Sequence, residues 1–153
     1  MTELPLADRE ATLALGRRLG AVARAGDVVL LDGPLGAGKT VLVRGLAQGL
    51  GSTAEVASPT FVLVRQYGGR LNLVHADLYR LDDPRDVDRL GLLEMTDDAV
   101  LVVEWPERAP ALAAAAALRL HLGSGPTVTS RTATISSAAP HLEAALDGGA
   151  DPR

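Results

Sequence analysis

A glycine-rich segment in the first third of the sequence has the residue types and spacing of a phosphate-binding loop. Residues 33–40 read Gly-Pro-Leu-Gly-Ala-Gly-Lys-Thr and fit the pattern G-x-x-x-x-G-K-[ST]. An apolar run precedes the segment and a helical pattern follows it, which is the context that the motif requires. Glycines let backbone N–H groups surround phosphate oxygens, and the helix adds its own unpaired N–H groups. We therefore expect nucleotide binding, with main-chain contacts from Gly36, Ala37 and Gly38.

The two side chains at the end of this loop predict contacts with phosphate and metal. Lys39 would reach the β- and γ-phosphates of a nucleotide, and the Thr40 hydroxyl would bind Mg²⁺. Lys39 is also the single lysine of the chain, whose 15 basic residues are otherwise all arginine. A planar guanidinium does not replace an ammonium inside a tight loop. The one lysine in an arginine-rich chain therefore supports the same interpretation.

A loop of this kind needs a carboxylate at the end of a neighbouring strand, where it holds Mg²⁺ directly or through water. Glu104 ends the apolar run from Val100 and is followed by Trp105-Pro106, which stops the strand. His75 and Asp77 stand two residues apart, and so on one face of another expected strand. Lys39, Asp77 and Glu104 are the candidate catalytic residues. His75 keeps two interpretations, a hydrogen-bonded core residue or a member of the site.

Two further features could approach the γ-phosphate. The tripeptide Ser58-Pro59-Thr60 precedes an expected hairpin, where a hydroxyl-bearing loop could respond to the nucleotide as switch segments do. It is also an ordinary way to begin a loop. Arg65 and Arg80 could stabilise transition-state charge, but arginines at strand ends are commonly solvated.

The elements that must position these residues follow from hydrophobic spacing and turn signals. Strands alternate with helices early in the chain, which favours an α/β fold of the P-loop NTPase type, with a largely parallel central sheet flanked by helices and a β-hairpin near residues 60–77. We expect helices at 7–25, after the glycine loop up to residue 49, and from the turn at 82–84. The expected strands cover 27–32, 60–67, 71–77, 99–104, 118–122 and 129–136.

Length and composition narrow the class of protein. The chain has 153 residues, of which 47% are hydrophobic and 22% charged, which predicts one globular domain. We expect that domain to span residues 1–137, and residues 138–153, rich in Ala, Gly, Asp and Pro, to form a loose tail. The net charge of −4 argues against unaided binding of nucleic acid. There is no cysteine for a zinc site or disulfide, no apolar run long enough for a membrane span, and no basic leader, so we expect a cytoplasmic protein.

Four segments, taken together, are more specific than the loop alone: GPLGAGKT from Gly33, SPTFVLV from Ser58, HADLYRL from His75 and VEWPER from Val103. Their order and spacing resemble the TsaE family, also called YjeE, the small bacterial P-loop ATPases of tRNA threonylcarbamoyladenosine synthesis. The resemblance implies an ATPase that uses ATP/ADP and Mg²⁺ and works with TsaD and TsaB when the threonylcarbamoyl group is transferred to tRNA. The tRNA would then be held by the partner proteins.

The resemblance also implies roles for individual residues. Lys39 would contact phosphates, Thr40 and Glu104 would bind Mg²⁺, and Asp77 with the Ser58 loop would respond to the nucleotide. Thr12 and Arg131 stand where family members approach the adenine. Val41 is also a candidate nucleotide-binding residue. It stands where many relatives have a second threonine, so a hydroxyl near the α-phosphate is missing. The chain after Arg108 adds little to the resemblance.

Other functions remain open from the residues alone. A GTPase would need a second lysine in its guanine-binding element, so adenine is favoured. A small-molecule kinase shares the loop and the length, and the three arginines between Arg80 and Arg89 could belong to a lid. A nucleotide-gated adaptor with negligible hydrolysis is the third reading, in which the bound nucleotide sets the affinity for TsaD and TsaB.

Overall fold

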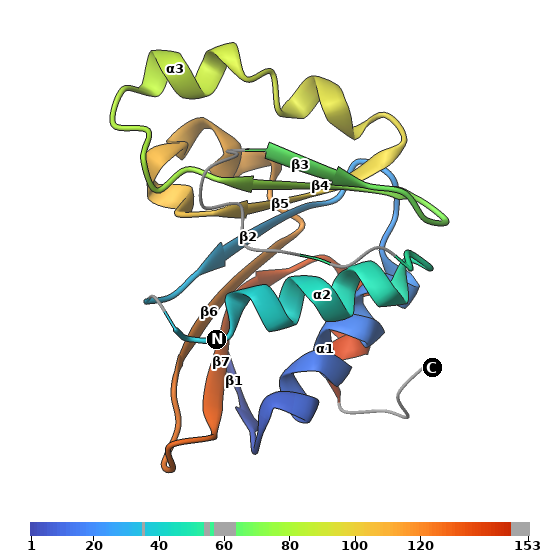
Figure 1. The fold of residues 1–153 in the computed structure, drawn as a ribbon, viewed down its shortest axis with the longest axis vertical. Helices are drawn as coiled ribbons and strands as arrows, with labels where there is room; N and C mark the ends of the chain where they lie inside the picture. The colour runs from blue at the N-terminus through green and yellow to red at the C-terminus, as the bar shows by residue number, and fades with distance from the viewer. Residues whose placement is uncertain (35, 54–55, 57–63, 148–153) are drawn as a thin grey trace.

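The computed structural model describes residues 1–34, 36–53, 56 and 64–147. These residues form strands, α-helices and short 3₁₀ helices (Figure 1). Along the chain the elements are β1 (Thr2–Leu6), α1 (Arg9–Val22), β2 (Val28–Asp32), α2 (Lys39–Gly49), β3 (Val64–Tyr67), β4 (Asn72–Asp77), α3 (Pro84–Arg89), η1 (Leu93–Thr96), β5 (Ala99–Glu104), η2 (Pro106–Arg108), η3 (Pro110–Ala115), β6 (Leu118–Ser124), β7 (Arg131–Ala138), α4 (Pro140–Glu143) and η4 (Ala144–Asp147).

The strands form one mixed sheet in the order β1-β7-β6-β2-β5-β4-β3. Its four central strands, β6, β2, β5 and β4, are parallel. Both edges are antiparallel, with β3 against β4 on one side and β7 and β1 on the other. The expectation of a largely parallel sheet therefore holds only for the centre. Neighbours joined by a short connection, such as β3 and β4, must run antiparallel, because a parallel pair needs a crossover of a dozen or more residues.

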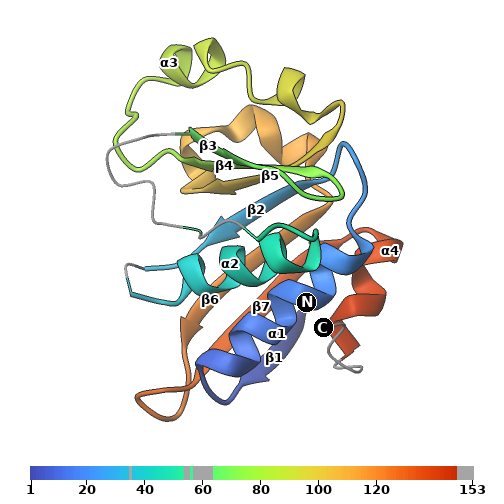
Figure 2. The same cartoon turned by 45° about the vertical axis from the view of Figure 1, so that its right-hand side comes forward.

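Helices cover the two faces of the sheet, as Figures 1 and 2 show from two directions. On one face α1 and α2 pack over residues such as Leu31, Leu73 and Val102. On the other face α3 and the 3₁₀ helices η1, η2 and η3 pack over Leu30, Val74 and other residues of opposite parity. This alternation is the pleat of each strand, which sends successive side chains to opposite faces. It decides which polar residues at the strand ends face α2.

Most expected elements are present, with shifted ends. The first helix is shorter than the expected 7–25: Asp8 caps it by accepting a hydrogen bond from the Ala11 amide at 2.9 Å, and Ala23 is already extended. The strand at Thr2–Leu6 was not expected, since Pro5 and acidic neighbours give it weak strand propensity. It forms because β7 supplies a partner at the sheet edge. The expected hairpin forms where it is described, since Val64–Tyr67 pairs with β4. The part of the expected strand before Val64 lies outside the described residues.

The two helices on the face that carries the glycine loop touch backbone to backbone. Four glycines meet there, Gly16 and Gly20 from α1 and Gly45 and Gly49 from α2, and a Cβ added at any of them would overlap the partner helix's main chain. Glycine normally weakens a helix by about 1 kcal/mol relative to alanine. Here it allows α1 to hold α2 close, and α2 begins at Lys39, so the contact fixes the position of the loop.

The C-terminal segment is part of the fold as far as residue 147. Leu142, Ala145 and Leu146 are buried in the core beside α1. The Arg18 side chain donates to the Ala145 carbonyl at 2.9 Å, and His141 lies 2.8 Å from Asp27. The expected loose tail from residue 138 is therefore wrong for these residues. The few apolar residues of this segment stand among many alanines, so the sequence did not reveal that they would be buried against α1. Residues 148–153 lie outside the described part of the chain.

We predict that Gly45→Ala lowers the free energy of unfolding by about 1–3 kcal/mol, because its methyl group would overlap the Leu13 carbonyl oxygen. The measurement is urea unfolding followed by circular dichroism. Gly68→Ala is the matched control: a Cβ there has ordinary contacts only, and a change within about 0.5 kcal/mol is expected. Equal stability of the two variants would contradict the close helix packing.

We also predict that Leu142→Ala destabilises the protein by about 2–5 kcal/mol, because Leu142 is 1% exposed and its removal leaves a cavity against α1. The neighbouring Glu143→Ala, at an exposed position, should change stability by less than about 0.5 kcal/mol. Thermal unfolding of both variants measures the difference. A loose tail would give the same small effect for both.

Candidate functional site

The glycine loop joins the end of β2 to the start of α2, at the carboxyl edge of the parallel strands. Gly36 and Gly38 have φ angles of 78° and 98°, in the left-handed region that favours glycine, and Gly38 caps α2. A Cβ at Gly33 would overlap the carbonyl oxygen of Leu122 on β6. Ala37 is buried and anchors the loop on the core. The local chemistry of the sequence therefore gives a compact turn whose backbone leads into the positive end of a helix dipole.

Lys39 is buried at the base of this loop, with 6% of its surface exposed. Its ammonium donates to the Gly33 carbonyl at 2.7 Å, which ties the two ends of the loop together. The same nitrogen lies 3.6 Å from Glu104 Oε1 and 4.9 Å from the centre of the Trp105 ring. A buried ammonium is tolerated only with partners of this kind. The lysine is thus held at the loop by a carbonyl, a carboxylate and an aromatic face.

The two expected carboxylates lie next to each other. Asp77 and Glu104 are directly paired in the parallel register of β4 and β5. Both strands end there, so both side chains reach the same edge of the sheet. A cavity of about 310 Å³ opens at this edge. The described residues that line it are Gly36, Gly38, Lys39, Thr40, Asp77, Glu104 and Trp105.

His75 belongs to this cluster and is completely buried. Its Nε2 lies 2.5 Å from Glu104 Oε2. Strand alternation explains the contact, since His75 and Glu104 point to the face covered by α2, as do Leu73 and Val102 behind them. Both interpretations offered by the sequence apply, because the histidine is a core residue that also contacts the candidate site.

The Asp77 carboxyl has its pKa raised above the usual range. Burial is the main cause, and the nearby Glu104 charge adds to it, while a hydrogen bond from the Tyr79 amide at 3.0 Å and the charges of His75 and Lys39 oppose it. Carboxyls with disfavoured charge collect at functional sites, where a cation or a proton can stabilise them. A divalent cation held close to the two acids would offset the cost of their charges.

Trp105 lines the site, although the sequence assigned it no role there: it marked the end of the strand and formed part of the VEWPER segment. Its φ of 59° is the only positive φ of a non-glycine residue in the described part of the chain. Such strain persists where surrounding contacts hold it. Here the indole ring contacts the Tyr79 ring in a tilted arrangement, with 4.9 Å between centres and 47° between planes, and covers the Lys39 ammonium. The signal available in the sequence was the lone tryptophan directly after the candidate metal-binding acid.

A second cavity, of about 460 Å³, lies on the other side of the loop. It is lined by Asp8, Arg9, Thr12, Gly36, Gly38, Val41, Val128, Thr129 and Arg131. The sequence-predicted residues Thr12, Val41 and Arg131 therefore meet there, although they come from α1, α2 and β7. The cavity shares Gly36 and Gly38 with the cavity beside Lys39 and Glu104, which we call the phosphate-side cavity. The two cavities therefore flank one loop.

Arg131 does more than line this cavity. Its guanidinium donates to the carbonyl oxygens of Gly36 at 3.3 Å and Ala37 at 3.1 Å, and also to those of Val128 and Ser130. One side chain thus ties the β6–β7 hairpin to the glycine loop. A guanidinium carries five N–H donors in a fixed plane, which suits this bracing role.

The remaining predicted residues differ in outcome. Ser58, Pro59 and Thr60 lie outside the described residues. The described lining of the phosphate-side cavity contains neither Arg65 nor Arg80.

No group of three or more His, Asp or Glu residues with metal-binding geometry occurs in the described part of the chain. No helix in that part reaches the length and apolarity of a membrane span.

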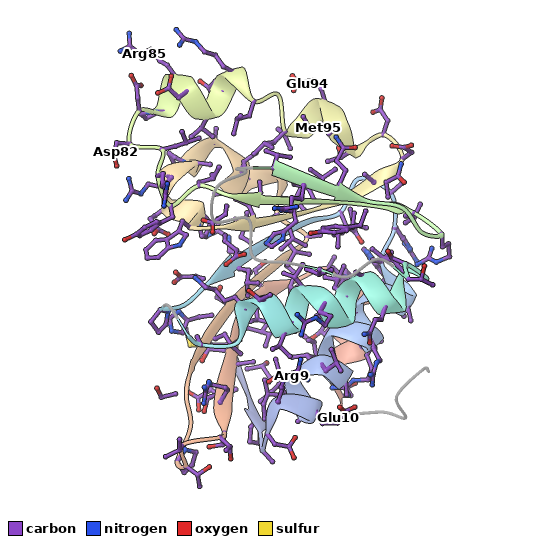
Figure 3. All side chains as sticks on the ribbon, in the orientation of Figure 1. Arg9, Glu10, Asp82, Arg85, Glu94 and Met95 are labelled. Carbon is purple, nitrogen blue, oxygen red and sulfur yellow. The ribbon has the colours of Figure 1, made fainter. Side chains whose placement is uncertain are left out.

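The arginines between Arg80 and Arg89 do not gather over the loop. Arg85 pairs with Asp83 at 2.9 Å and Arg89 with Asp86 at 3.3 Å, both on the exposed surface. Figure 3 shows Arg85 at the outer tip of the molecule, at the opposite end from Arg9 on α1. The hydrogen bond from Arg85 holds the pKa of Asp83 below its usual range. These charges support helix α3 locally.

The sequence and the fold both match known proteins. Residues 6–133 match the family model described as Threonylcarbamoyl adenosine biosynthesis protein TsaE. The tRNA threonylcarbamoyladenosine biosynthesis protein TsaE of Nostoc sp. is 48% identical over 117 residues, which cover 72% of this chain and 71% of the relative. The protein of the same name from Streptomyces coelicolor is 52% identical over 97 residues, covering 61% and 66%.

A solved structure has a similar fold over nearly the whole chain. The crystal structure of Bacillus subtilus YdiB superposes with a TM-score of 0.74 at 30% identity, over 94% of this chain and 90% of that one. The family-model match and the relatives together show that this chain belongs to the TsaE family of threonylcarbamoyl adenosine biosynthesis proteins.

Proposed function

We propose that this protein binds ATP and ADP with Mg²⁺ and acts in the threonylcarbamoyladenosine modification of tRNA. The observation that carries the proposal is the convergence of Lys39, Thr40, Asp77 and Glu104 on one cavity at the start of α2. In this proposal the protein works with TsaD and TsaB when the threonylcarbamoyl group is transferred. The relatives' names and the family-model description support the pathway.

The residues at the phosphate-side cavity fit a magnesium ion bound together with a nucleotide. Hydroxyl and carboxylate oxygens are the ligands that Mg²⁺ prefers, and Mg²⁺ usually takes only one or two protein ligands, leaving its other positions to phosphates and water. Thr40 and Glu104 would hold the ion, and Asp77 would contact it through water or position the attacking water. The bound ion would neutralise charge on the phosphates.

The loop and its lysine would hold the phosphates. Backbone N–H groups at Gly36, Ala37 and Gly38 would surround phosphate oxygens at the α2 N-terminus. A phosphate would compete with the Gly33 carbonyl for the Lys39 ammonium, which has three N–H donors and could keep its contact with Glu104.

The second cavity suits the base and ribose. It lies beside the same loop, and Thr12, Val41, Val128 and the stem of Arg131 offer mostly apolar surface with a few polar groups, as nucleoside sites do. The hydroxyl missing at Val41 leaves that wall without a polar contact near the α-phosphate.

We propose that the isolated protein hydrolyses ATP slowly, at less than about 1 s⁻¹, the low end of the range for kinases. No arginine is found among the described residues that line the phosphate-side cavity, so an arginine that stabilises the transition state would come from a partner. The net charge of −4 agrees with tRNA being held by TsaD and TsaB rather than by this chain. Such a role belongs in the cytoplasm.

Two other functions are less well supported. A small-molecule kinase would need arginines that close over the acceptor, whereas Arg85 and Arg89 are paired within α3. A nucleotide-gated adaptor without hydrolysis would use the same cavity. Rapid phosphate transfer to a metabolite would favour the kinase, and tRNA modification without ATP hydrolysis would favour the adaptor.

We predict that Lys39→Arg raises the dissociation constant for Mg²⁺–ATP at least about tenfold, equivalent to about 1.4 kcal/mol. The wider guanidinium cannot occupy the space between Gly33, Glu104 and Trp105 that holds the ammonium. Trp105, the only tryptophan in the chain, allows the titration to be followed by intrinsic fluorescence.

Arg89→Lys, an exchange of the same two residue types on the exposed surface of α3, is the control and should leave the affinity unchanged. Tight binding by the Lys39→Arg variant would show that this lysine is not a phosphate ligand.

We predict that Glu104→Ala and Thr40→Ala abolish repeated rounds of tRNA modification while leaving association with TsaB–TsaD intact. Loss of either metal-binding side chain should prevent hydrolysis without changing the partner surface. The assay mixes each variant with TsaB–TsaD, substrate tRNA and the threonylcarbamoyl donor in the presence of ATP, and counts modified tRNA per complex. Unchanged modification by both variants would favour the adaptor function. Modification that continues for many rounds without this protein and without ATP would overturn the proposal.

A further inference from the structure

The His75–Glu104 contact gives the two oxygens of one carboxylate different surroundings. His75 Nε2 lies 2.5 Å from Oε2, whereas the Lys39 ammonium lies 3.6 Å from Oε1. His75 is fully buried and Glu104 is 4% exposed, so water does not compete for the first contact. One oxygen is therefore held by the protein interior, and the other faces the loop.

The chemistry of the pair determines the direction of this hydrogen bond. An ionised carboxylate can only accept, so beside an ionised Glu104 the imidazole donates from Nε2. The other ring nitrogen, Nδ1, is buried and has no hydrogen-bond partner among the described residues. The contact with Glu104 is thus the one side-chain hydrogen bond of His75 to the described part of the chain. A histidine that only filled space would be replaced at lower cost by an apolar residue.

A carboxylate with one fixed oxygen has only one orientation to offer. Without a donor at Oε2, the Glu104 side chain could rotate about its terminal bond and turn either oxygen toward Lys39. Partners behind a metal-binding side chain restrict such rotation, and their loss typically costs 10–100-fold in metal affinity or activity.

We propose that His75 is a positioning residue, which fixes the Glu104 carboxylate so that Oε1 is presented to the Mg²⁺–nucleotide. This inference rests on the proposed function and deepens it, because it adds to the nucleotide site a residue that touches neither phosphate nor metal. In this role His75 acts by donating one hydrogen bond to Glu104.

Two substitutions of similar polarity separate positioning from packing. The amide nitrogen of His75→Gln reaches about as far as the imidazole Nε2 and can donate to Glu104. The amide of His75→Asn is shorter and cannot. Circular dichroism and thermal unfolding show whether each variant folds, and ATP turnover is measured with the full chain and TsaB–TsaD as a function of Mg²⁺ concentration.

His75→Asn is expected to raise the half-saturating Mg²⁺ concentration and lower kcat by about 10–100-fold in total. Binding of ATP without Mg²⁺, measured by calorimetry, should change less than about twofold, because it depends on Lys39 and the loop amides. His75→Gln should restore most of the loss. Equal defects in both variants, or wild-type Mg²⁺ dependence in His75→Asn, would overturn the inference.

A double-mutant cycle tests whether the effect passes through Glu104. In a Glu104→Gln background, His75→Asn should cause no further change in the Mg²⁺ dependence of ATP binding, measured by calorimetry, since the carboxylate it orients is gone. An additive loss would mean that His75 acts by another route.

His141 provides a matched control far from the loop in sequence. It lies 2.8 Å from the buried Asp27, so His141→Asn removes a comparable pair. This variant should lower the thermal stability but leave the Mg²⁺ dependence unchanged. If the wild-type protein binds no ATP with or without Mg²⁺, the proposed function fails and this inference fails with it; normal ATP binding with an unaltered His75→Asn variant refutes the inference alone.

Discussion

The burial of one ammonium group against one carboxylate is the constraint on which the arrangement of this protein depends. Lys39 and Glu104 are both almost completely buried, and each needs partners to offset the loss of water. The loop supplies the Gly33 carbonyl to the lysine, and β4 supplies His75 to the glutamate. Because these partners come from separate segments, the ion pair forms only when the loop, α2 and the two strands are assembled.

The surrounding fold holds those segments at fixed spacing. Glycines at the α1–α2 contact let the helices approach until their backbones touch, which sets where Lys39 begins α2. The parallel register of β4 and β5 sets Asp77 beside Glu104. Arg131 ties the β6–β7 hairpin to the loop from the other side. A site held on rigid elements needs little rearrangement when a charged ligand arrives, and less of the binding free energy goes into ordering it.

The strained backbone at Trp105 fits the same pattern. Its left-handed conformation turns the chain sharply after Glu104 and places the indole over Lys39, with the Tyr79 ring tilted against it. The aromatic pair reduces the access of water to the ammonium and strengthens its electrostatic contacts. Tyr79 is still 46% exposed, so this wall of the site is also part of the protein surface.

The sequence by itself determined the loop, its lysine and the acid at the end of β5, because glycine spacing and an apolar strand ending in a carboxylate are local patterns. It also indicated the hairpin and the helix start at Asp83. Only the tertiary structure decided the contacts between distant segments: His75 with Glu104, Arg131 with the loop carbonyls, β1 at the sheet edge and the C-terminal residues against α1. Their partners lie far apart along the chain. Local propensity carries no information about such pairings, since they form only when the helices and strands pack together.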